Sequence, residues 1–217
     1  MAALPKGDTE MDDMRTISSK ADLLKGVPDP YPFILEAVKP EMDEFHIAFV
    51  ERAPFLCLSS VDASGFPNIS PRGDSPGFVK VMSSSAIAVP DRVGNNKMET
   101  SRAVLENPHV GIIFLLPGVR ETVRMKGTAH LTDDAEVLSL WPDDKWAPKR
   151  ATMIDVSMVT FHCGKSVVRS GLWKADQQLE PGGFPSLGAI LRGQATLPAP
   201  VEAVDEMIEG EYRDAIE

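Results

Sequence analysis

The sequence predicts a mainly β fold with helices, in which the strands form a closed or nearly closed antiparallel barrel. In residues 121–131, apolar and polar side chains alternate, as they do in a strand that buries one face. Residues 62–65, Asp-Ala-Ser-Gly, lie between two apolar runs and are typical of a hairpin turn. Short apolar runs recur along the chain and together predict seven strands, at residues 55–61, 66–70, 77–82, 86–89, 109–116, 121–131 and 154–163.

Helices are predicted between and around these strands. A short helix at residues 21–24 stops before Gly26, and the helix at 41–52 mixes apolar with acidic residues, which suits a helix with one face on a sheet. The helix at 98–106 ends at Asn107, since the next residue is proline. Three later segments also have helical patterns: 164–173, 186–192 and 201–216. Residues 133–150, with Trp141 and Trp146, form a helical or irregular excursion.

The composition limits the class of protein. The chain has 217 residues, a formal net charge of −10 and a sequence pI near 4.9, which argues against duplex nucleic acid or an anionic membrane as the main partner. The two cysteines, Cys57 and Cys163, lie far apart in sequence, and we expect a reducing, cytoplasmic location. The N-terminal residues have no apolar core of a secretory signal, and no segment is long enough to cross a bilayer.

The loop at residues 91–97 is the strongest candidate for a binding site. It combines Arg92, Lys97, Gly94 and the amides Asn95 and Asn96 directly before a predicted helix. A helix N-terminus presents free backbone N–H groups and a partial positive charge, so this loop suits an anion such as phosphate. The alternative is that Asn95 or Asn96 caps the helix while the cations are solvated.

Other chemistries find no support in the sequence. The four histidines show no ligand spacing with cysteines or carboxylates, so no metal site is predicted. No GxSxG, P-loop or GxGxxG pattern occurs, which leaves serine hydrolases, nucleoside triphosphatases and Rossmann dehydrogenases without a motif. The Arg-Gly-Asp triplet at residues 72–74 is interpreted as part of a turn.

Four motifs, in order, resemble the FMN-binding split barrels related to pyridoxamine 5′-phosphate oxidase, and more closely an uncharacterised bacterial subgroup of FMN-dependent proteins. They are SPRGDSPGFVKV at residues 70–81, VPDRVGNNKMETSRAVLENPHVGIIFLLPG at 89–118, ETVRMKGTAHL at 121–131 and FHCGKSVVRSGLW at 161–173. The resemblance covers roughly residues 30–190. It implies a homodimer with FMN at the interface and a split-barrel domain at residues 30–173, between an N-terminal extension (1–29) and a helical C-terminal extension (174–217).

The resemblance also implies roles for residues around the phosphate of FMN. Asn95, Asn96 and Lys97 would hold the phosphate at the helix start, and Arg72 would reach the flavin from the loop after the second strand. The alternative for Arg72 is an ion pair with Asp74. Further candidates in the same regions are Asp74, Asp91, Arg92 and Ser101. The alternative for Ser101 and for Arg102 is that, one helical turn further on, they only line the surface.

The flavin ring needs apolar contact on its faces, hydrogen bonds at its edge and positive charge near its pyrimidine end. Val89 and Pro90 are expected to contact the ring through their backbone. His162, Lys165, Arg169 and Trp173 are spaced so that several could share one helical face, and they are expected to reach the ring of the neighbouring subunit. The alternative is that Trp173 caps the barrel while Lys165 and Arg169 pair with acidic residues across the dimer.

The chain departs from true pyridoxamine 5′-phosphate oxidases at its C-terminus. Those enzymes have an arginine-rich end that holds the substrate phosphate, whereas this chain ends in EGEYRDAIE, with Arg213 the single cation there. The segment NNKMETSR also differs from their Ser-Lys phosphate signature. Oxidation of vitamin B6 is therefore not expected.

Two function classes remain. In the first, the protein is an FMN-dependent oxidoreductase that acts on a small organic substrate, and its catalytic residues are not identified. In the second, it binds or senses flavin or another cofactor, such as haem, without turnover. A shared fold does not separate these two classes.

Overall fold

The computed structural model describes residues 16–94, 96–142 and 147–216. The chain divides into two compact units, Met1–Glu36 and Ala37–Glu217. The described part of the first unit holds α1 (Lys20–Leu24) and α2 (Pro32–Glu36), neither of which has a buried residue. The predicted helix at 21–24 is confirmed as α1. Helix α2 was not predicted. It begins with proline, which is tolerated in the first turn because the N–H there needs no partner within the helix.

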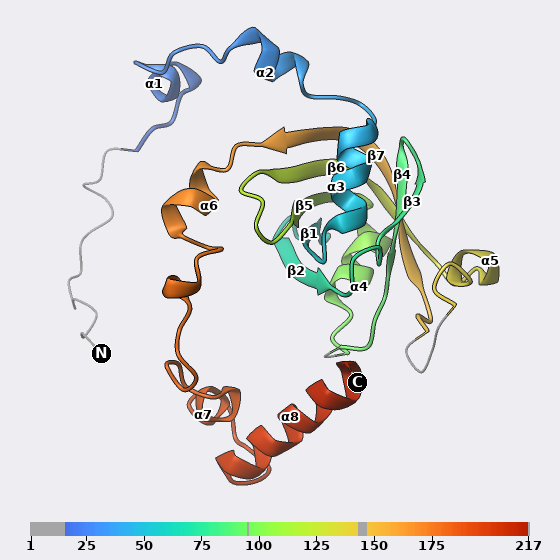
Figure 1. The fold of residues 1–217 in the computed structure, drawn as a ribbon, viewed down its shortest axis with the longest axis vertical. Helices are drawn as coiled ribbons and strands as arrows, with labels where there is room; N and C mark the ends of the chain where they lie inside the picture. The colour runs from blue at the N-terminus through green and yellow to red at the C-terminus, as the bar shows by residue number, and fades with distance from the viewer. Residues whose placement is uncertain (1–15, 95, 143–146, 217) are drawn as a thin grey trace. The chain divides into compact units, whose positions relative to one another are not determined.

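The second unit contains one antiparallel sheet of seven strands in the order β2-β1-β5-β6-β7-β4-β3 (Figure 1). The predicted mainly β antiparallel fold with helices is therefore confirmed. The bounds of the strands are β1 Phe55–Val61, β2 Pro67–Gly73, β3 Lys80–Ser83, β4 Ala86–Pro90, β5 His109–Leu115, β6 Thr122–Thr132 and β7 Ala151–His162.

Strand β2 is longer than predicted. We expected it to end at Ser70, but it pairs with β1 as far as Phe55↔Gly73, so Arg72 lies within the strand and not in the loop after it. Pro71 makes the sequence look like a loop, because proline cannot donate to a ladder. An edge strand such as β2 tolerates it.

The sheet curls strongly. Strands β2 and β4 are separated by four strands in the sheet order, yet Asp74, just after β2, lies 2.8 Å from Arg92, just after β4. The indole Nε1 of Trp141, which follows β6 in sequence, donates to the carbonyl of Phe78 before β3 at 2.8 Å. Among the described residues, the edge strands β2 and β3 are not paired with each other.

Two helices pack on the sheet and close its core. Helix α3 (Glu44–Arg52) contacts β3, β6 and β7, and α4 (Glu99–Glu106) contacts β1, β2 and β6 (Figure 1). The predicted alternation of β6 is confirmed, since Val123 and Met125 are buried and Arg124 is exposed. The largest fully buried side chains of this core include Phe114, Leu56, Leu58, Ile87, Met125 and Ile154.

The C-terminal helices differ in part from the prediction. Helix α6 covers only Lys165–Ser170, because Gly171 takes a left-handed conformation with φ 64° and ends it. Helices α7 (Leu187–Arg192) and α8 (Val201–Ile216) confirm the two helical segments predicted there, and they pack against each other. The excursion after β6 contains α5 (Ala135–Leu138), while Trp146 lies outside the described residues. In the described ranges, no helix is long and apolar enough to cross a membrane.

Candidate functional site

The loop between β4 and α4 has an unusual backbone. Asn96 and Met98 both have left-handed conformations, with φ 58° and 57°, which are uncommon for residues other than glycine. Met98 is the N-cap of α4, and its side chain makes no capping hydrogen bond. The alternative that Asn96 caps this helix is therefore wrong, and Asn95 lies outside the described residues.

Asp91 is held by an arginine that the sequence analysis missed. Arg150, directly before β7, donates to Asp91 Oδ2 from Nε at 3.1 Å and from Nη2 at 2.9 Å. The Asp91 backbone N–H donates to the Arg150 carbonyl at 2.9 Å, which extends the β4–β7 ladder by one step. Nothing local in the sequence singles out Arg150, because its role depends on the pairing of β4 with β7.

The partner of Asp74 is not the one given in the alternative for Arg72. Its carboxylate accepts from Arg92 Nε at 2.8 Å, so the alternative in which it pairs with Arg72 is wrong. Arg72 instead donates to the Ser70 hydroxyl and to the Pro71 carbonyl, both neutral oxygens. The Arg72 side chain is half-buried. Burial lowers the pKa of its guanidinium, while the negative charge of Asp91 acts in the opposite direction.

We call this group of residues the sheet-end cluster: Arg72, Asp74, Asp91, Arg92 and Arg150. Near it in sequence, Lys97 is exposed one residue before the N-cap of α4. In the first turn of that helix, Ser101 is half-buried and Arg102 is exposed. The structure therefore brings together four of the predicted residues (Arg72, Asp74, Asp91 and Arg92) and adds Arg150.

Val89 and Pro90 are buried at the end of β4. On one side they pair with Thr152 and Ala151 of β7, but the ladder with β3 on the other side reaches only Ala88. On that side, the backbone of Val89 and Pro90 lies beyond the end of the β3 ladder. This is compatible with the expected backbone contact to a ligand.

The residues expected on one helical face after β7 are not all on a helix. His162 is the last residue of β7, exposed and paired with Thr122, and Trp173 follows the glycine that ends α6. Only Lys165 and Arg169 share α6, so the prediction of a common helical face holds for these two alone. The Trp173 indole donates to the carbonyl of Val119 at 2.8 Å.

Lys165 and Arg169 line a cleft of about 310 Å³ between α6 and the β5–β6 turn. We call it the α6 cleft, and its lining residues are Arg120, Glu121, Gly164, Lys165, Val168 and Arg169. The sheet-end cluster and the α6 cleft lie at opposite ends of β7, since Arg150 precedes Ala151 and Gly164 follows His162. A strand of twelve residues spans roughly 35 Å.

Among the described residues, no group of three histidine, cysteine or acidic side chains is placed to hold a metal ion. The chemistry of both regions is instead that of arginine and lysine beside a few carboxylates. Such groups bind anions, and the half-buried Arg72 donates hydrogen bonds to neutral oxygens.

Comparison with known proteins identifies the family. The family profile described as pyridoxamine 5′-phosphate oxidase matches residues 42–162, which is more than half of the chain. The chain therefore belongs to this family, as the sequence motifs indicated. No curated protein matches it.

Several solved structures are similar at low sequence identity. HupZ from Group A Streptococcus is 17% identical over 54% of this chain and 91% of its own, with a TM-score of 0.45. A candidate pyridoxamine 5′-phosphate oxidase from Lactobacillus delbrueckii is 15% identical over 56% and 94%, with a TM-score of 0.45. An FMN-binding protein from Syntrophomonas wolfei is 12% identical over 59% and 88%, with a TM-score of 0.41.

Proposed function

We propose that this member of the pyridoxamine 5′-phosphate oxidase family is a flavoprotein that binds FMN as a homodimer and oxidises or reduces a small organic substrate. The flavin domain comprises residues 30–173, with residues 1–29 and 174–217 as extensions. The sheet-end cluster holds the phosphate, and residues 162–173 approach the flavin ring bound by the second subunit.

Arg72 is the observation that carries this proposal. Its guanidinium is half-buried, and burying a charge without an ionic partner costs free energy. Its hydrogen bonds go to the neutral oxygens of Ser70 and Pro71, and the nearby Asp91 is already held by two bonds from Arg150. A bound phosphate would supply the missing negative charge and accept charge-assisted hydrogen bonds.

The charges near this site suit a phosphate dianion. The cluster has three arginines and two carboxylates, and its two ion pairs, Arg92 with Asp74 and Arg150 with Asp91, neutralise four of these five groups. The hydrogen bonds of Arg72, the fifth group, go to neutral oxygens, and Lys97 is a further cation in the adjacent loop. Phosphate at neutral pH carries a charge between about −1.5 and −2.

The backbone before α4 supports the same assignment. Two left-handed residues, Asn96 and Met98, bend the chain just ahead of a helix whose N-cap side chain makes no capping bond. The first N–H groups of a helix need an acceptor from outside it, and an anion is a suitable one. Left-handed backbone at ordinary residues is costly and often marks a binding site.

The flavin supplies the redox chemistry when it is bound, and the protein holds and orients it. Arg72, Lys97 and the start of α4 would bind the phosphate. The backbone edge of Val89 and Pro90, beyond the end of β3, would hydrogen-bond to the edge of the ring. Lys165 and Arg169 would place positive charge near the ring from the partner.

The outer face of the sheet supports a homodimer. The outward faces of β1, β2 and β5 carry apolar side chains, among them the exposed Phe55 and Ile69 and the half-buried Ile113. The other face of this sheet is already packed in the core. A sheet with two apolar faces buries both of them. A dimer is also what the proposed contacts require, because one flavin is much shorter than β7 and residues at both ends of this strand would reach the same flavin only from two subunits.

The test compares FMN with riboflavin, which lacks the phosphate. We expect the wild-type protein to bind FMN much more tightly than riboflavin, measured by quenching of flavin fluorescence. Arg72→Ala and Lys97→Ala should each weaken FMN binding by about 10- to 100-fold, the usual effect of losing a charge-assisted hydrogen bond, while riboflavin binding changes little.

The matched control is Arg213→Gln, which removes one positive charge from α8. It should leave both affinities unchanged. Equal affinity of the wild-type protein for FMN and riboflavin would disprove the phosphate site, and a protein that takes up neither would disprove the flavoprotein assignment. The mass of the chromophore released on denaturation identifies the flavin that is bound.

A further inference from the structure

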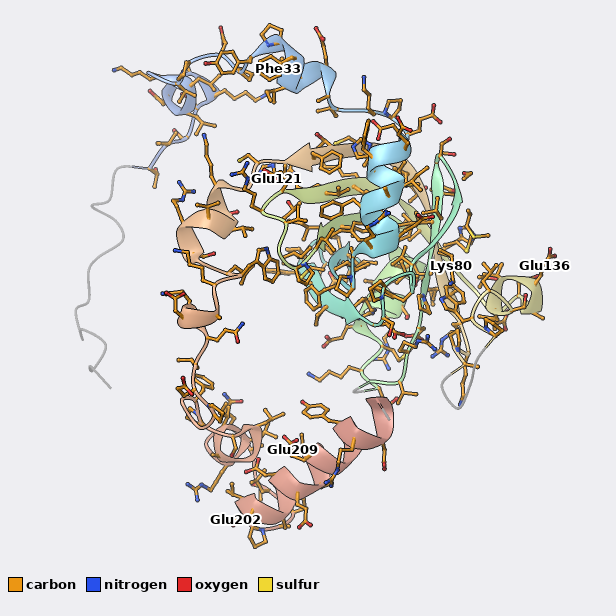
Figure 2. All side chains as sticks on the ribbon, viewed as in Figure 1. Phe33, Lys80, Glu121, Glu136, Glu202 and Glu209 are labelled. Carbon is orange, nitrogen blue, oxygen red and sulfur yellow. The ribbon has the colours of Figure 1, made fainter. Side chains whose placement is uncertain are left out.

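The α6 cleft lies apart from the sheet-end cluster and shares no residue with it. It is formed where the turn before β6 meets the chain after β7. The two strands pair to their ends at Thr122↔His162, so residues 120–121 and 164–169 are held side by side. Figure 2 labels Glu121 at this edge of the sheet, on the side where α6 lies. The cleft therefore has a fixed position, set by the longest ladder of the sheet.

Both ends of α6 are anchored on the same turn. At the start of the helix, a Cβ on Gly164 would lie 2.7 Å from the Cγ and from the carbonyl oxygen of Arg120, so only glycine allows this approach. At its end, the left-handed Gly171 reverses the chain, and the Trp173 indole reaches back to the carbonyl of Val119 at 2.8 Å. Helix α6 is thus held at both of its ends against the turn before β6, and the cleft lies between the helix and this turn.

The lining of the cleft is cationic in a protein whose net charge is −10. Arg120, Lys165 and Arg169 face a single carboxylate among the lining residues, Glu121. Arg120 Nε donates to Glu121 Oε1 at 2.9 Å, and both side chains are well exposed, at 70% and 42%. An exposed pair of this kind is weak, so a ligand anion can replace Glu121 as the partner of Arg120.

The volume of the cleft and its apolar surface indicate which class of ligand it could bind. A volume of about 310 Å³ is at the lower end of the range for small-molecule sites, and it suits a small organic molecule. Val168 lines the cleft with 56% of its surface exposed, and it gives an apolar contact beside the charges. An organic anion with a carboxylate or phosphate group and a short apolar body matches this lining.

From these observations we infer that the α6 cleft binds a small organic anion through Arg120, Lys165 and Arg169, and that this anion is the substrate class of the protein. The assignment of this anion as the substrate rests on the proposed function, because the proposed dimer places the cleft of one subunit beside the flavin of the other. The binding site itself needs only the geometry of one chain. Arg120, which the sequence motifs did not indicate, becomes a substrate-binding residue.

The first experiment titrates the full-length protein with benzoate, with phenyl phosphate and with uncharged benzyl alcohol in a calorimeter. We expect the anions to bind and the alcohol not to bind, and the tighter anion shows whether the site prefers carboxylate or phosphate. Arg120→Gln and Arg169→Gln should each weaken binding of the preferred anion at least tenfold. Glu121→Gln should tighten it severalfold, because the competing carboxylate is lost.

Arg213→Gln again serves as the control for a general loss of charge. Equal weakening in this control, equal binding of benzyl alcohol, or unchanged binding in Arg120→Gln and Arg169→Gln would each overturn the site. If an arginine variant folds poorly, Glu121→Gln still tests the site. In this variant a higher affinity for the anion is expected, and poor folding would not produce a gain in affinity. Unchanged binding in Glu121→Gln would contradict the role of Arg120.

The second experiment separates this inference from the proposed function. The preferred anion is added to the FMN-loaded protein, and a change in the visible absorption of the flavin is expected if the cleft lies beside the ring. An unchanged spectrum with intact anion binding would overturn the assignment as substrate. A protein that binds the anion through Arg120 but takes up no FMN would disprove the proposed function and leave the anion site standing.

Discussion

The sheet-end cluster and the α6 cleft are both rich in arginine, but different forces hold their cations in place. In the cluster, partly buried ion pairs fix the side chains: Asp91 is 22% exposed and Asp74 is 30% exposed. In the cleft, the side chains of Arg120 and Glu121 are exposed. There, the close approach of Gly164 to the backbone of Arg120 fixes α6 and the turn before β6, which carry the charged side chains. The first region is built by electrostatics and the second by packing.

This difference shows that net charge alone does not describe an anion site. An ion pair gains strength as water is excluded, so a change of charge in the cluster should affect folding as well as binding. In the cleft, water screens the charges, and a change of charge should affect binding only. A substitution that disturbs backbone packing should have the reverse pattern. It should lower the free energy of unfolding more in the cleft than in the cluster.

The largest expected effect is that of Gly164→Ala. The added Cβ would lie 2.7 Å from the carbonyl oxygen and 2.8 Å from the carbonyl carbon of Arg120, so the turn must move. We expect the free energy of unfolding to fall by about 2–3 kcal/mol, measured by urea denaturation, with a loss of anion binding at the cleft.

The control for this substitution is Gly210→Ala in α8, where the added Cβ meets no atom within 4 Å apart from its chain neighbours and the backbone of its own helix. Alanine favours a helix over glycine by up to about 1 kcal/mol, so this variant should be as stable as the wild type or more stable. If Gly164→Ala behaved like the control, packing of the turn on α6 would not be what holds the cleft.

A smaller effect is expected for Asp91→Asn, which removes the charge that Arg150 binds through two hydrogen bonds. Hydrogen bonds to charged groups contribute about 1.5–3 kcal/mol when they are buried. Because Arg150 is 43% exposed, we expect a loss of only about 1–2 kcal/mol in the free energy of unfolding. The exposed Asp133→Asn provides the comparison in the same urea series and should change stability little.

Glu121→Gln tests the other side of the comparison. The Arg120–Glu121 pair is exposed, so its loss should change the free energy of unfolding by no more than about 0.5 kcal/mol. The same variant is expected to bind organic anions more tightly. A loss of stability as large as that of Asp91→Asn would mean that exposure does not distinguish the two regions.

A small effect that depends on pH is expected at Asp43, which caps α3 outside both regions. Burial raises the pKa of Asp43, but hydrogen bonds from the backbone N–H groups of His46 and Phe45, together with the His46 ring, lower it more, so the net pKa lies below its ordinary value of 3.8. A carboxylate with a lowered pKa stabilises the fold above pH 3.8, and this contribution is lost as the pH falls through the lowered pKa.

In Asp43→Asn this loss in acid should be absent, because asparagine also caps helices but does not titrate there. The Asp43 side chain is 48% exposed, so the difference between the variant and the wild type should stay below about 1 kcal/mol. Urea midpoints at neutral pH and near pH 3 measure it. An identical acid response in both proteins would contradict the role of the cap.

Local patterns predicted most of the elements. The alternation in β6 and the turn after β1 follow from the period of a strand and the chemistry of short turns, and both are confirmed. The predictions failed where a partner strand or a single glycine decided the outcome. Strand β2 continues through Pro71 because β1 pairs with it, and α6 stops at Gly171.

For the candidate site, the sequence indicated the loop and its cations but not their partners. Asp74 pairs with Arg92, eighteen residues away, and Asp91 pairs with Arg150, fifty-nine residues away. No local pattern relates residues so far apart, because their contacts depend on how the sheet curls. Arg120 was missed for the same reason, since its meeting with Gly164 depends on the pairing of β6 with β7.

The sequence by itself determined that this chain forms an antiparallel, mainly β sheet with helices and that it belongs to the pyridoxamine 5′-phosphate oxidase family, because hydrophobic period, turn residues and ordered motifs are local properties. The tertiary structure alone decided that Asp74 meets Arg92 and Asp91 meets Arg150, that the Arg72 side chain is half-buried, and that α6 is held against the turn that carries Arg120. Those features arise from contacts between residues distant in sequence, and such contacts exist only once the sheet has curled and its strands have paired.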